Sequence, residues 1–235
     1  KKITKKKYIV LTAMCRVSFY LTLNYLKKNK NKNEIIVPAF TWISDLVSII
    51  KNGFKPIFVD IDKRNLCMDI ELVKKKINKK TLAIFITHAM GFAGFTKKFT
   101  QFIKKKKIFL VEDVCESHGA KLNDRKIGTF GAISNFSFYY GHHMTTVEGG
   151  MISTNSKQID RLAKMKRGHG LLRDSQDNSF NKKIISESND LNNDFIFYTE
   201  GFNLRNTELS AVIGIEQLKR LDKNIRIRNQ NHKFF

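Results

Sequence analysis

The segment that decides the fold class runs from Glu34 to Asp60 and reads EIIVPAFTWISDLVSIIKNGFKPIFVD. An apolar strand at 34–37 ends at Pro38, because proline lacks the N–H group that a strand ladder needs. A helix is predicted over 43–51, and it ends at Asn52-Gly53, a typical helix C-cap. A second strand follows at 56–60. A strand, a helix and a strand in this order predict a unit with parallel strands.

The same alternation continues on both sides of this segment. Further strands are predicted at 8–11, 82–87, 107–111, 133–138 and 151–154, and further helices at 15–28, 69–77, 158–165 and 207–221. The alternation predicts an α/β fold with a mainly parallel sheet. No internal repeat or linker-like break divides the chain, so residues 1–235 are expected to form one domain.

Composition narrows the class of protein. The chain has 235 residues, of which 42% are hydrophobic, which is ample for a packed core. No apolar run approaches the roughly 18 residues that span a bilayer. The three cysteines, Cys15, Cys67 and Cys115, are far apart and form no CxxC pair, so neither a disulfide framework nor an iron–sulfur or other metal site is expected. We therefore expect a cytoplasmic protein with reduced thiols and no membrane partner.

The formal net charge of +22 raises the alternative of nucleic-acid binding. Local lysine clusters at 27–32, 74–80 and 104–107 lie in stretches that resemble turns, among asparagines. They lack the interleaved aromatic side chains on which bases would stack. We therefore favour a solvated basic surface over nucleic-acid binding, and such a surface would also attract an anionic substrate.

Polar residues follow the ends of two predicted strands, where ligands bind in parallel α/β sheets. Glu112-Asp113 closes an apolar strand. Such an acid either keeps a cofactor's pyridine nitrogen protonated or caps a helix, and the spacing alone does not separate the two. Ser137 ends the next strand, and His142-His143 follows. Adjacent histidines cannot share one face of a strand, so a paired metal site is not expected.

Several segments together resemble one enzyme family, the sugar aminotransferases and dehydratases called DegT/DnrJ/EryC1/StrS, which are fold-type-I pyridoxal-phosphate enzymes. The main matches are residues 37–42 with 53–62, residues 112–120, and residues 136–138 through 148–151. Supporting matches are His88 with Gly91, His169-Gly170 with Arg173-Asp174, residues 201–205, 208–211 and 217–221. The resemblance implies a large domain built as an α/β/α sandwich. It also implies that the family's N-terminal helix and most of its C-terminal small domain lie outside these 235 residues, which would make the chain a fragment.

The resemblance also implies roles for individual residues. Asp113 would pair with the ring nitrogen of pyridoxal 5'-phosphate or pyridoxamine 5'-phosphate, and Trp42 would stack on the ring. Ser137 would hold the phosphate together with the backbone around Cys15-Arg16, where the family usually has Gly-Thr. The resemblance places Glu116 near the ring hydroxyl. It places His88, Asn203 and Arg205 near the substrate or the neighbouring subunit's cofactor, which implies a homodimer.

The main departure from the family is His142. Counted back from Glu148-Gly149-Gly150, this residue stands where the family places the lysine that forms a Schiff base with the cofactor. An imidazole cannot form that bond, so the cofactor would be held noncovalently and His142 could act as a base. This substitution resembles the family's sugar 3-dehydratases.

The implied reaction is 3-dehydration of a nucleotide-linked 4-keto-6-deoxy sugar in polysaccharide biosynthesis, with glutamate as amino donor. Residues 169–174 look more like the ordinary aminotransferases, so transamination stays open as an alternative. A noncatalytic binding homologue that lost its lysine is the third possibility.

Overall fold

The computed structural model describes residues 3–26, 31–188 and 190–234. Its centre is a seven-stranded sheet in the order β1-β9-β8-β5-β4-β2-β3. The strands are β1 (Tyr8–Thr12), β2 (Glu34–Pro38), β3 (Lys55–Val59), β4 (Thr81–Thr87), β5 (Phe109–Asp113), β8 (Ile133–Ser137) and β9 (Gly150–Thr154). The five strands from β8 to β3 are mutually parallel, whereas β9 is antiparallel to both β8 and β1.

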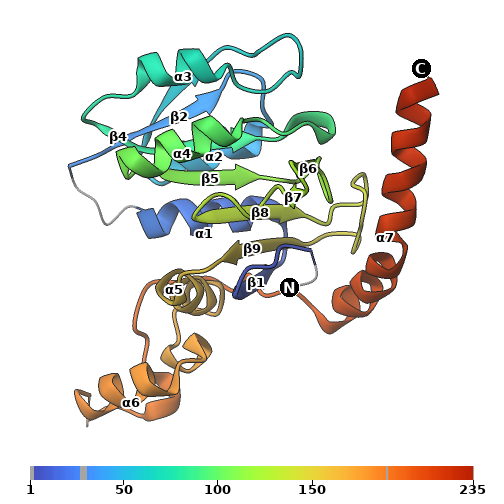
Figure 1. Ribbon diagram of the computed structural model, residues 1–235. Coiled ribbons are helices and arrows are strands. Elements are labelled where there is room, and N and C mark those ends of the chain that lie inside the picture. Colours follow the sequence, from blue (N-terminus) through green and yellow to red (C-terminus); the bar gives the residue numbers. More distant parts are fainter. Residues whose placement is uncertain (1–2, 27–30, 189, 235) are drawn as a thin grey trace.

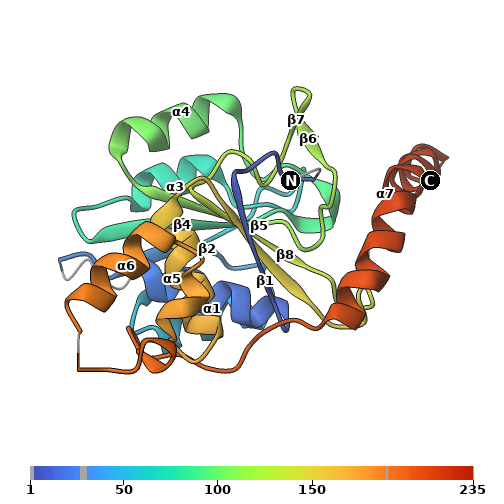
Figure 2. The same ribbon diagram turned by 90° about the horizontal axis from the view of Figure 1, so that it is seen from below.

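Helices cover both faces of the sheet and make three layers (Figures 1 and 2). On one face lie α1 (Cys15–Leu26), α2 (Ile43–Lys51) and α5 (Lys157–Arg167). On the other face lie α3 (Ile70–Lys76) and α4 (Lys97–Lys106). The hairpin of β6 (Lys121–Leu122) and β7 (Arg125–Lys126) and the helix α6 (Asn178–Ser186) complete the periphery, together with three short 3-10 turns, η1 (Ala89–Gly91), η2 (Leu172–Ser175) and η3 (Asn193–Phe195). The expected α/β fold with a mainly parallel sheet is confirmed.

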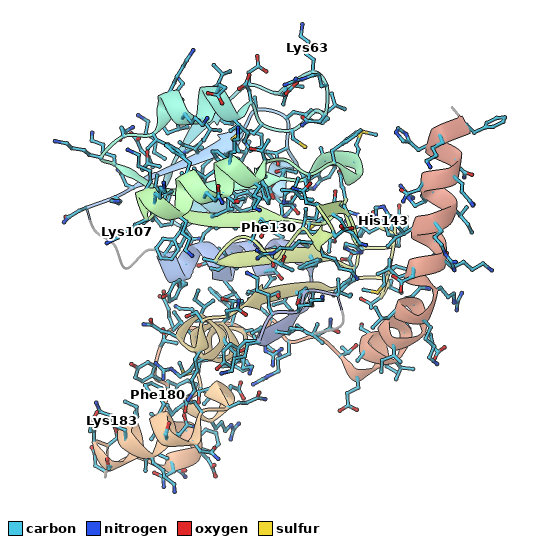
Figure 3. The ribbon with its side chains drawn as sticks, viewed as in Figure 1. Lys63, Lys107, Phe130, His143, Phe180 and Lys183 are labelled. Atoms are coloured by element: carbon cyan, nitrogen blue, oxygen red, sulfur yellow. The ribbon has the colours of Figure 1, made fainter. Side chains whose placement is uncertain are left out.

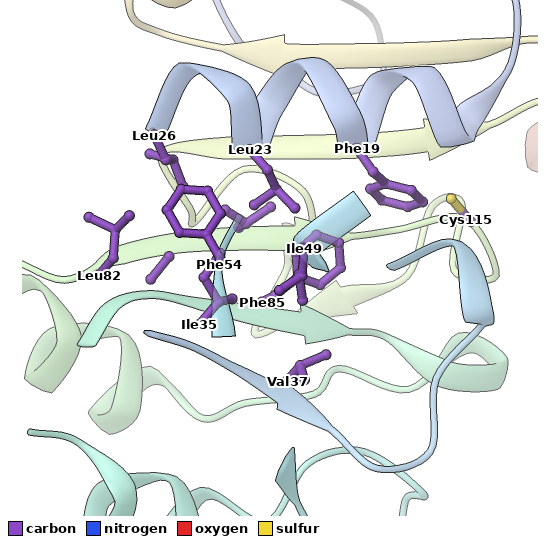
Figure 4. Close-up of a cluster of buried hydrophobic side chains, with 12 residues drawn as sticks. Phe19, Leu23, Leu26, Ile35, Val37, Ile49, Phe54, Leu82, Phe85 and Cys115 are labelled. Atoms are coloured by element: carbon purple, nitrogen blue, oxygen red, sulfur yellow. The ribbon is translucent and has the colours of Figure 1, made fainter. Parts of the chain in front are cut away.

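Strand alternation sends side chains from one strand into two separate cores. Phe85 and Val111 pack with Phe19 and Ile49 of α1 and α2, in the cluster shown in Figure 4. Leu110 joins a second cluster against α3 and α4. Odd-numbered residues of β5 therefore face α1 and α2, and even-numbered residues face α3 and α4.

The predicted helix at 43–51 has the observed bounds of α2. The lysines at 74–76 and 104–106 lie in the last turns of α3 and α4, so their assignment to turns was wrong. Cations are favoured there because the carbonyl end of a helix carries partial negative charge. In the remaining lysine cluster, at 27–32, residues 27–30 lie outside the described residues. The end of the helix predicted at 15–28 lies outside them as well.

The last helix, α7 (Glu208–Phe234), is longer than the predicted 207–221. It stands beside the edge of the sheet at which β5 and β8 end (Figure 1), and Leu221 is its one buried residue. Several large apolar side chains on it are exposed, among them Leu209, Val212 and Ile215. Within the described part of the chain, no helix is both long and apolar enough to cross a bilayer.

Candidate active site

Five segments deliver polar or aromatic residues to one edge of the sheet. Because β1 and β8 are both antiparallel to β9, β1 runs in the same direction as the parallel strands. The residues that follow the ends of β1, β2, β4, β5 and β8 therefore lie at one edge. They include Cys15, Trp42, Asp113 and Ser137. This carboxyl edge is where α/β sheets bind ligands.

Asp113, the last residue of β5, is an almost fully buried acid. Its side chain is 5% exposed, and its Oδ1 accepts a hydrogen bond of 2.9 Å from the backbone N–H of Cys115. Burial raises the pKa of Asp113 to about 6, partly offset by the hydrogen bonds from Cys115. Because position 113 is odd-numbered, the carboxyl faces α1 and α2. A cationic group placed beside it would favour the ionised form.

Cys15 begins α1 and lies beside the ends of β5 and β8. Its Sγ is 3.0 Å from Sγ of Cys115, and burial raises the pKa of the Cys15 thiol, which also contacts the Ser137 hydroxyl. Arg16 Nε donates to the Ser44 hydroxyl of α2 over 3.3 Å. The first turn of α1 and Ser137 thus meet next to Asp113. Backbone N–H groups at a helix start and a hydroxyl suit an anion such as phosphate.

His142 lies in the loop between β8 and β9, where its backbone N–H bonds to the carbonyl of Tyr139 at 3.1 Å. The side chain is half-buried, and burial lowers the pKa of the imidazole, with the charge of Glu116 opposing this. The neutral ring is therefore the dominant form near neutral pH, so it can accept a proton. The charge of Glu116 also acts on Asp113, so the same carboxylate lies near both residues.

The Glu148-Gly149-Gly150 turn fixes this loop through close packing. A Cβ on Gly149 would come within 2.4 Å of the Thr146 hydroxyl. A Cβ on Gly150 would come within 2.5 Å of the carbonyl oxygen of Met14, directly before α1. Glycine is therefore required sterically where β9 passes the start of α1.

His88 stays a predicted substrate or trans-subunit residue, but its surroundings favour a structural role. This residue is 0% exposed, and both of its ring nitrogens are used inside the chain. Nδ1 accepts from the N–H of Gly94 at 2.9 Å, so Nε2 carries the proton and faces Glu112 at 3.3 Å. Glu112 also accepts from the N–H groups of Gly128 and Gly131. The pair is a structural element of the α3/α4 side and leaves no imidazole nitrogen for a substrate.

Two other predicted residues lie on the outer surface. Asn203 is exposed, and Arg205 donates to Asp174 of the same chain at 2.6 Å. Their predicted contact with a neighbouring subunit stays a prediction. Trp42 is 70% exposed at the sheet edge, so one face of its indole is open to a ligand.

The sequence analysis missed Asp45 and His118. Asp45 is fully buried in α2 and accepts from the Thr87 hydroxyl at the end of β4. His118 is 3% exposed, with its ring centroid 6.2 Å from that of His142. The sequence does contain a pattern that indicates burial of Asp45. In the predicted helix this acid falls on the same face as Ser48 and Ile49, which are buried. Among the described residues, no group of three or more histidines, cysteines or acids could hold a metal ion.

A buried acid, a helix start beside a serine, an open indole and a neutral imidazole around one edge of a parallel sheet are the arrangement expected of the fold-type-I pyridoxal-phosphate class. The class narrows to one family: the DegT/DnrJ/EryC1/StrS aminotransferase family matches residues 1–235, and the chain belongs to it.

Comparisons with individual proteins agree with this assignment. The chain is 37% identical over 216 residues to a GDP-4-keto-6-deoxy-D-mannose 3-dehydratase of Yersinia pseudotuberculosis, covering 91% of this chain and 54% of that protein. It is 32% identical to a GDP-perosamine synthase of Vibrio cholerae, over 94% of this chain and 55% of that protein. The chain therefore spans about half the length of the curated relatives it matches.

A solved structure gives the same result in three dimensions. The structure of the Escherichia coli GDP-4-keto-6-deoxy-D-mannose-3-dehydratase with bound hydrated pyridoxal phosphate superposes with a TM-score of 0.87 and 32% identity. The alignment covers 99% of this chain and 61% of that one. The fold is therefore that of the large domain of fold-type-I pyridoxal-phosphate enzymes.

Proposed function

We propose that this chain binds pyridoxal 5'-phosphate or pyridoxamine 5'-phosphate noncovalently and acts in the 3-dehydration of a nucleotide-linked 4-keto-6-deoxy sugar. The observation that carries the proposal is His142, a neutral imidazole at the position of the family's lysine, on which the charge of Glu116 acts as it does on the buried acid Asp113. The similarity to a GDP-4-keto-6-deoxy-D-mannose 3-dehydratase favours a GDP-linked sugar.

The residues at the sheet edge fit this cofactor. Asp113 is buried with a pKa of about 6, so a pyridinium N–H beside it would stabilise its ionised form. Trp42 presents an open indole face, and aromatic rings pack well in offset stacks. Ser137 and the first turn of α1 offer hydroxyl and N–H donors for a phosphate. The exposed carboxylate of Glu116 accepts from the N–H of Met90 at 3.0 Å, and the family resemblance would place it near the ring hydroxyl.

Each residue then has a defined task in the reaction. The bound cofactor supplies an electron sink that stabilises negative charge next to the ring. Asp113 would keep the ring nitrogen protonated, and Trp42 would hold the plane of the ring. A nitrogen of the neutral His142 imidazole would accept a proton from carbon and would return it to the departing hydroxyl oxygen. Glutamate is the proposed donor that restores the amine form.

Transamination is the second candidate, and one observation favours it. The GDP-perosamine synthase of Vibrio cholerae matches over 94% of this chain, so the same scaffold is similar to an amination enzyme. The missing lysine weighs against it, because transamination normally uses that amine for proton transfer. Product analysis separates the two reactions, since only amination leaves nitrogen on the sugar.

We further propose that the protein is a homodimer in the cytoplasm. Phe40, Trp42, Ile43 and Ile50 are all more than half exposed around the candidate site. Large apolar side chains gathered at one place favour a protein partner. The described cysteines are unpaired, which fits a reducing compartment. Light scattering with size-exclusion chromatography tests the dimer directly, and a monomer at micromolar concentration would contradict it.

The decisive experiment replaces His142 by Lys in the full-length protein. With pyridoxal phosphate, the wild type is expected to bind the cofactor without a covalent bond, whereas His142→Lys becomes labelled on that lysine after borohydride reduction. Dehydration of GDP-, CDP- and dTDP-linked 4-keto-6-deoxy sugars in the presence of glutamate is expected to fall about a thousandfold in the variant, within the usual range for loss of a general base.

The adjacent histidine provides a matched control. His143 is also half-buried, and burial lowers its pKa to about 4. His143→Lys is expected to gain no covalent cofactor, because position 142, and not position 143, corresponds to the family's lysine. Equal labelling of both variants, or unchanged dehydration by His142→Lys, would show that position 142 does not face the cofactor.

A further inference from the structure

Three oxygen atoms from three segments meet in a buried triangle at the edge of the sheet. Thr41 Oγ1 lies 2.7 Å from Thr87 Oγ1. Thr87 Oγ1 lies 3.3 Å from Asp45 Oδ2, and Thr41 Oγ1 is in close contact with the same carboxyl oxygen. Asp45 is 0% exposed and Thr87 is 7% exposed, whereas Thr41 is half-buried, so the carboxyl oxygen is shielded from water.

Counting hydrogens shows which protonation state allows all three contacts to be hydrogen bonds. Three oxygen pairs are within hydrogen-bond distance, but the two threonine hydroxyls supply only two hydrogens. If Asp45 were ionised, one of the three oxygen–oxygen contacts would have no hydrogen between its atoms. A protonated carboxyl group supplies the third hydrogen, and each oxygen can then donate once and accept once.

The surroundings favour the same neutral state. Burial raises the pKa of Asp45 well above its ordinary value, with the charges of Asp113 and Glu116 adding to the effect. The other oxygen, Oδ1, is buried and has no hydrogen-bond partner. Leaving a buried charge with one unpartnered oxygen would be costly.

The triangle joins the two sides of the proposed cofactor site. Thr41 directly precedes Trp42, and the carbonyl of Trp42 accepts from the N–H of Asp45 at 3.0 Å. Thr87 ends β4 and is paired in register with Asp113 on β5. Both have odd numbers and face α2, the helix that carries Asp45. The group therefore connects the segment of the stacking residue with the strand end of the nitrogen-binding acid.

We propose that Asp45 is a positioning residue that, as a neutral carboxylic acid, closes a ring of hydrogen bonds with Thr41 and Thr87 and so fixes Trp42 against the strand end carrying Asp113. The inference rests on the proposed function for its importance to the cofactor. Ionisation of Asp45 breaks the ring and releases the Trp42 segment, so the position of the indole depends on pH.

Trp42 is the only tryptophan of the chain, so its fluorescence reports on this segment alone. We expect the emission of the cofactor-free protein to change as pH rises past the ordinary aspartate range of about 4. Asp45→Asn supplies an amide N–H in place of the acidic hydrogen and does not titrate. Its emission is expected to match the low-pH form of the wild type and to lose most of the pH-dependent change.

Other titratable groups face the same region, and they account for any pH-dependent change in emission that remains in Asp45→Asn. They are Asp113 at the end of β5, Glu116 after that strand, and Cys15 and Arg16 of α1. Asp160 is the matched control, because it is a buried acid in the first turn of α5, is 5% exposed and also has an unpartnered Oδ1. Asp160→Asn is expected to show the wild-type curve.

Quenching of Trp42 by added pyridoxal phosphate measures cofactor affinity in the same samples. We expect Asp45→Asn to bind within about twofold of the wild type, and Asp45→Val, which cannot close the ring, to bind about tenfold more weakly. If the wild type binds no cofactor, the proposed function fails while the pH curves still test the role of Asp45. A wild-type pH transition in Asp45→Asn, or unchanged emission and affinity in Asp45→Val, would overturn the inference.

Discussion

The two ends of strand β5 differ in the kind of polar surface that they present. At the amino end, a cavity of about 800 Å³ is lined by exposed lysines of α4, by Arg125 and by Phe130. At the carboxyl end, Asp113 and Ser137 are buried and Cys15 is half-buried. Burial raises the pKa values of Asp113 and Cys15. Lys107 and His143 mark these opposite ends in Figure 3.

This difference shows which observations identify a site. The amino end has an open cavity lined by several cations, but its lysines are solvated, and exposed cations contribute little to specific chemistry. The carboxyl end has less charge, but its groups are desolvated, where electrostatic effects are strong. Cofactor chemistry is therefore expected at the carboxyl end, and the net charge of +22 belongs mainly to the solvated surface.

The largest expected effect at the carboxyl end concerns stability. His88→Leu removes both hydrogen bonds of the ring and leaves the buried Glu112 without its imidazole partner. We expect a loss of about 3–5 kcal/mol in the free energy of unfolding, measured by urea denaturation. His232→Leu on the exposed surface of α7 serves as the control and should change stability by about 0.5 kcal/mol or less. Normal stability of His88→Leu would restore the idea of a substrate contact.

Asp113 gives a prediction in which stability and function change in opposite directions. Its folded pKa of about 6 lies above the ordinary value of 3.8, so the stability it contributes is complete below the ordinary value and is lost as pH rises through about 6. Asp113→Asn avoids this loss. At pH ~8 the cofactor-free variant should be more stable than the wild type by about 2–3 kcal/mol.

The same variant should bind the cofactor poorly. An amide cannot pair with a pyridinium charge, so pyridoxal phosphate affinity should fall about a hundredfold, or about 2.7 kcal/mol, in fluorescence titrations. Thermal unfolding from pH ~5 to ~8 provides the stability curve. A variant that binds the cofactor normally would show that Asp113 is not the nitrogen partner.

The smallest effects are expected at the amino end. Lys97→Gln and Lys104→Gln change exposed residues of the basic cavity. Each should alter the free energy of unfolding by less than about 0.5 kcal/mol and leave cofactor affinity unchanged. A drop in affinity comparable to that of Asp113→Asn would show that the two ends of β5 are not functionally distinct.

Sequence patterns predicted the elements with strong periodicity and the residues at strand ends. The bounds of α2 and the placement of Asp113 and Ser137 at one edge follow from apolar runs that end in polar residues. Helix α4 was missed because lysines dominate its pattern, although Phe99 and Ile103 are buried at helical spacing. The antiparallel direction of β9 between β1 and β8 depends on long-range pairing that no local pattern encodes.

The site residues show the same limit. His88 matches the family pattern, but the pattern does not show that Glu112 and Gly94 occupy its two ring nitrogens. The partners of Asp45 come from residues 4 and 42 positions away, and the second of these contacts exists only after the sheet has formed. Where a site forms only when several strands come together, the sequence predicts which strand ends contribute to it. It does not predict which side chains contact one another.

The adjacent acids Glu112 and Asp113 have a consequence for how this fold can change. Neighbouring residues of a strand point to opposite faces, so one acid anchors the α3/α4 layer while the other serves the α1/α2 layer. A shift of β5 by one residue would exchange the two acids. Glu112 would then face α1 and α2, and Asp113 would face Gly128 and Gly131, whose N–H groups now bind Glu112. We therefore expect proteins of this fold to have no insertions or deletions within this strand. The loops on either side of it can vary in length.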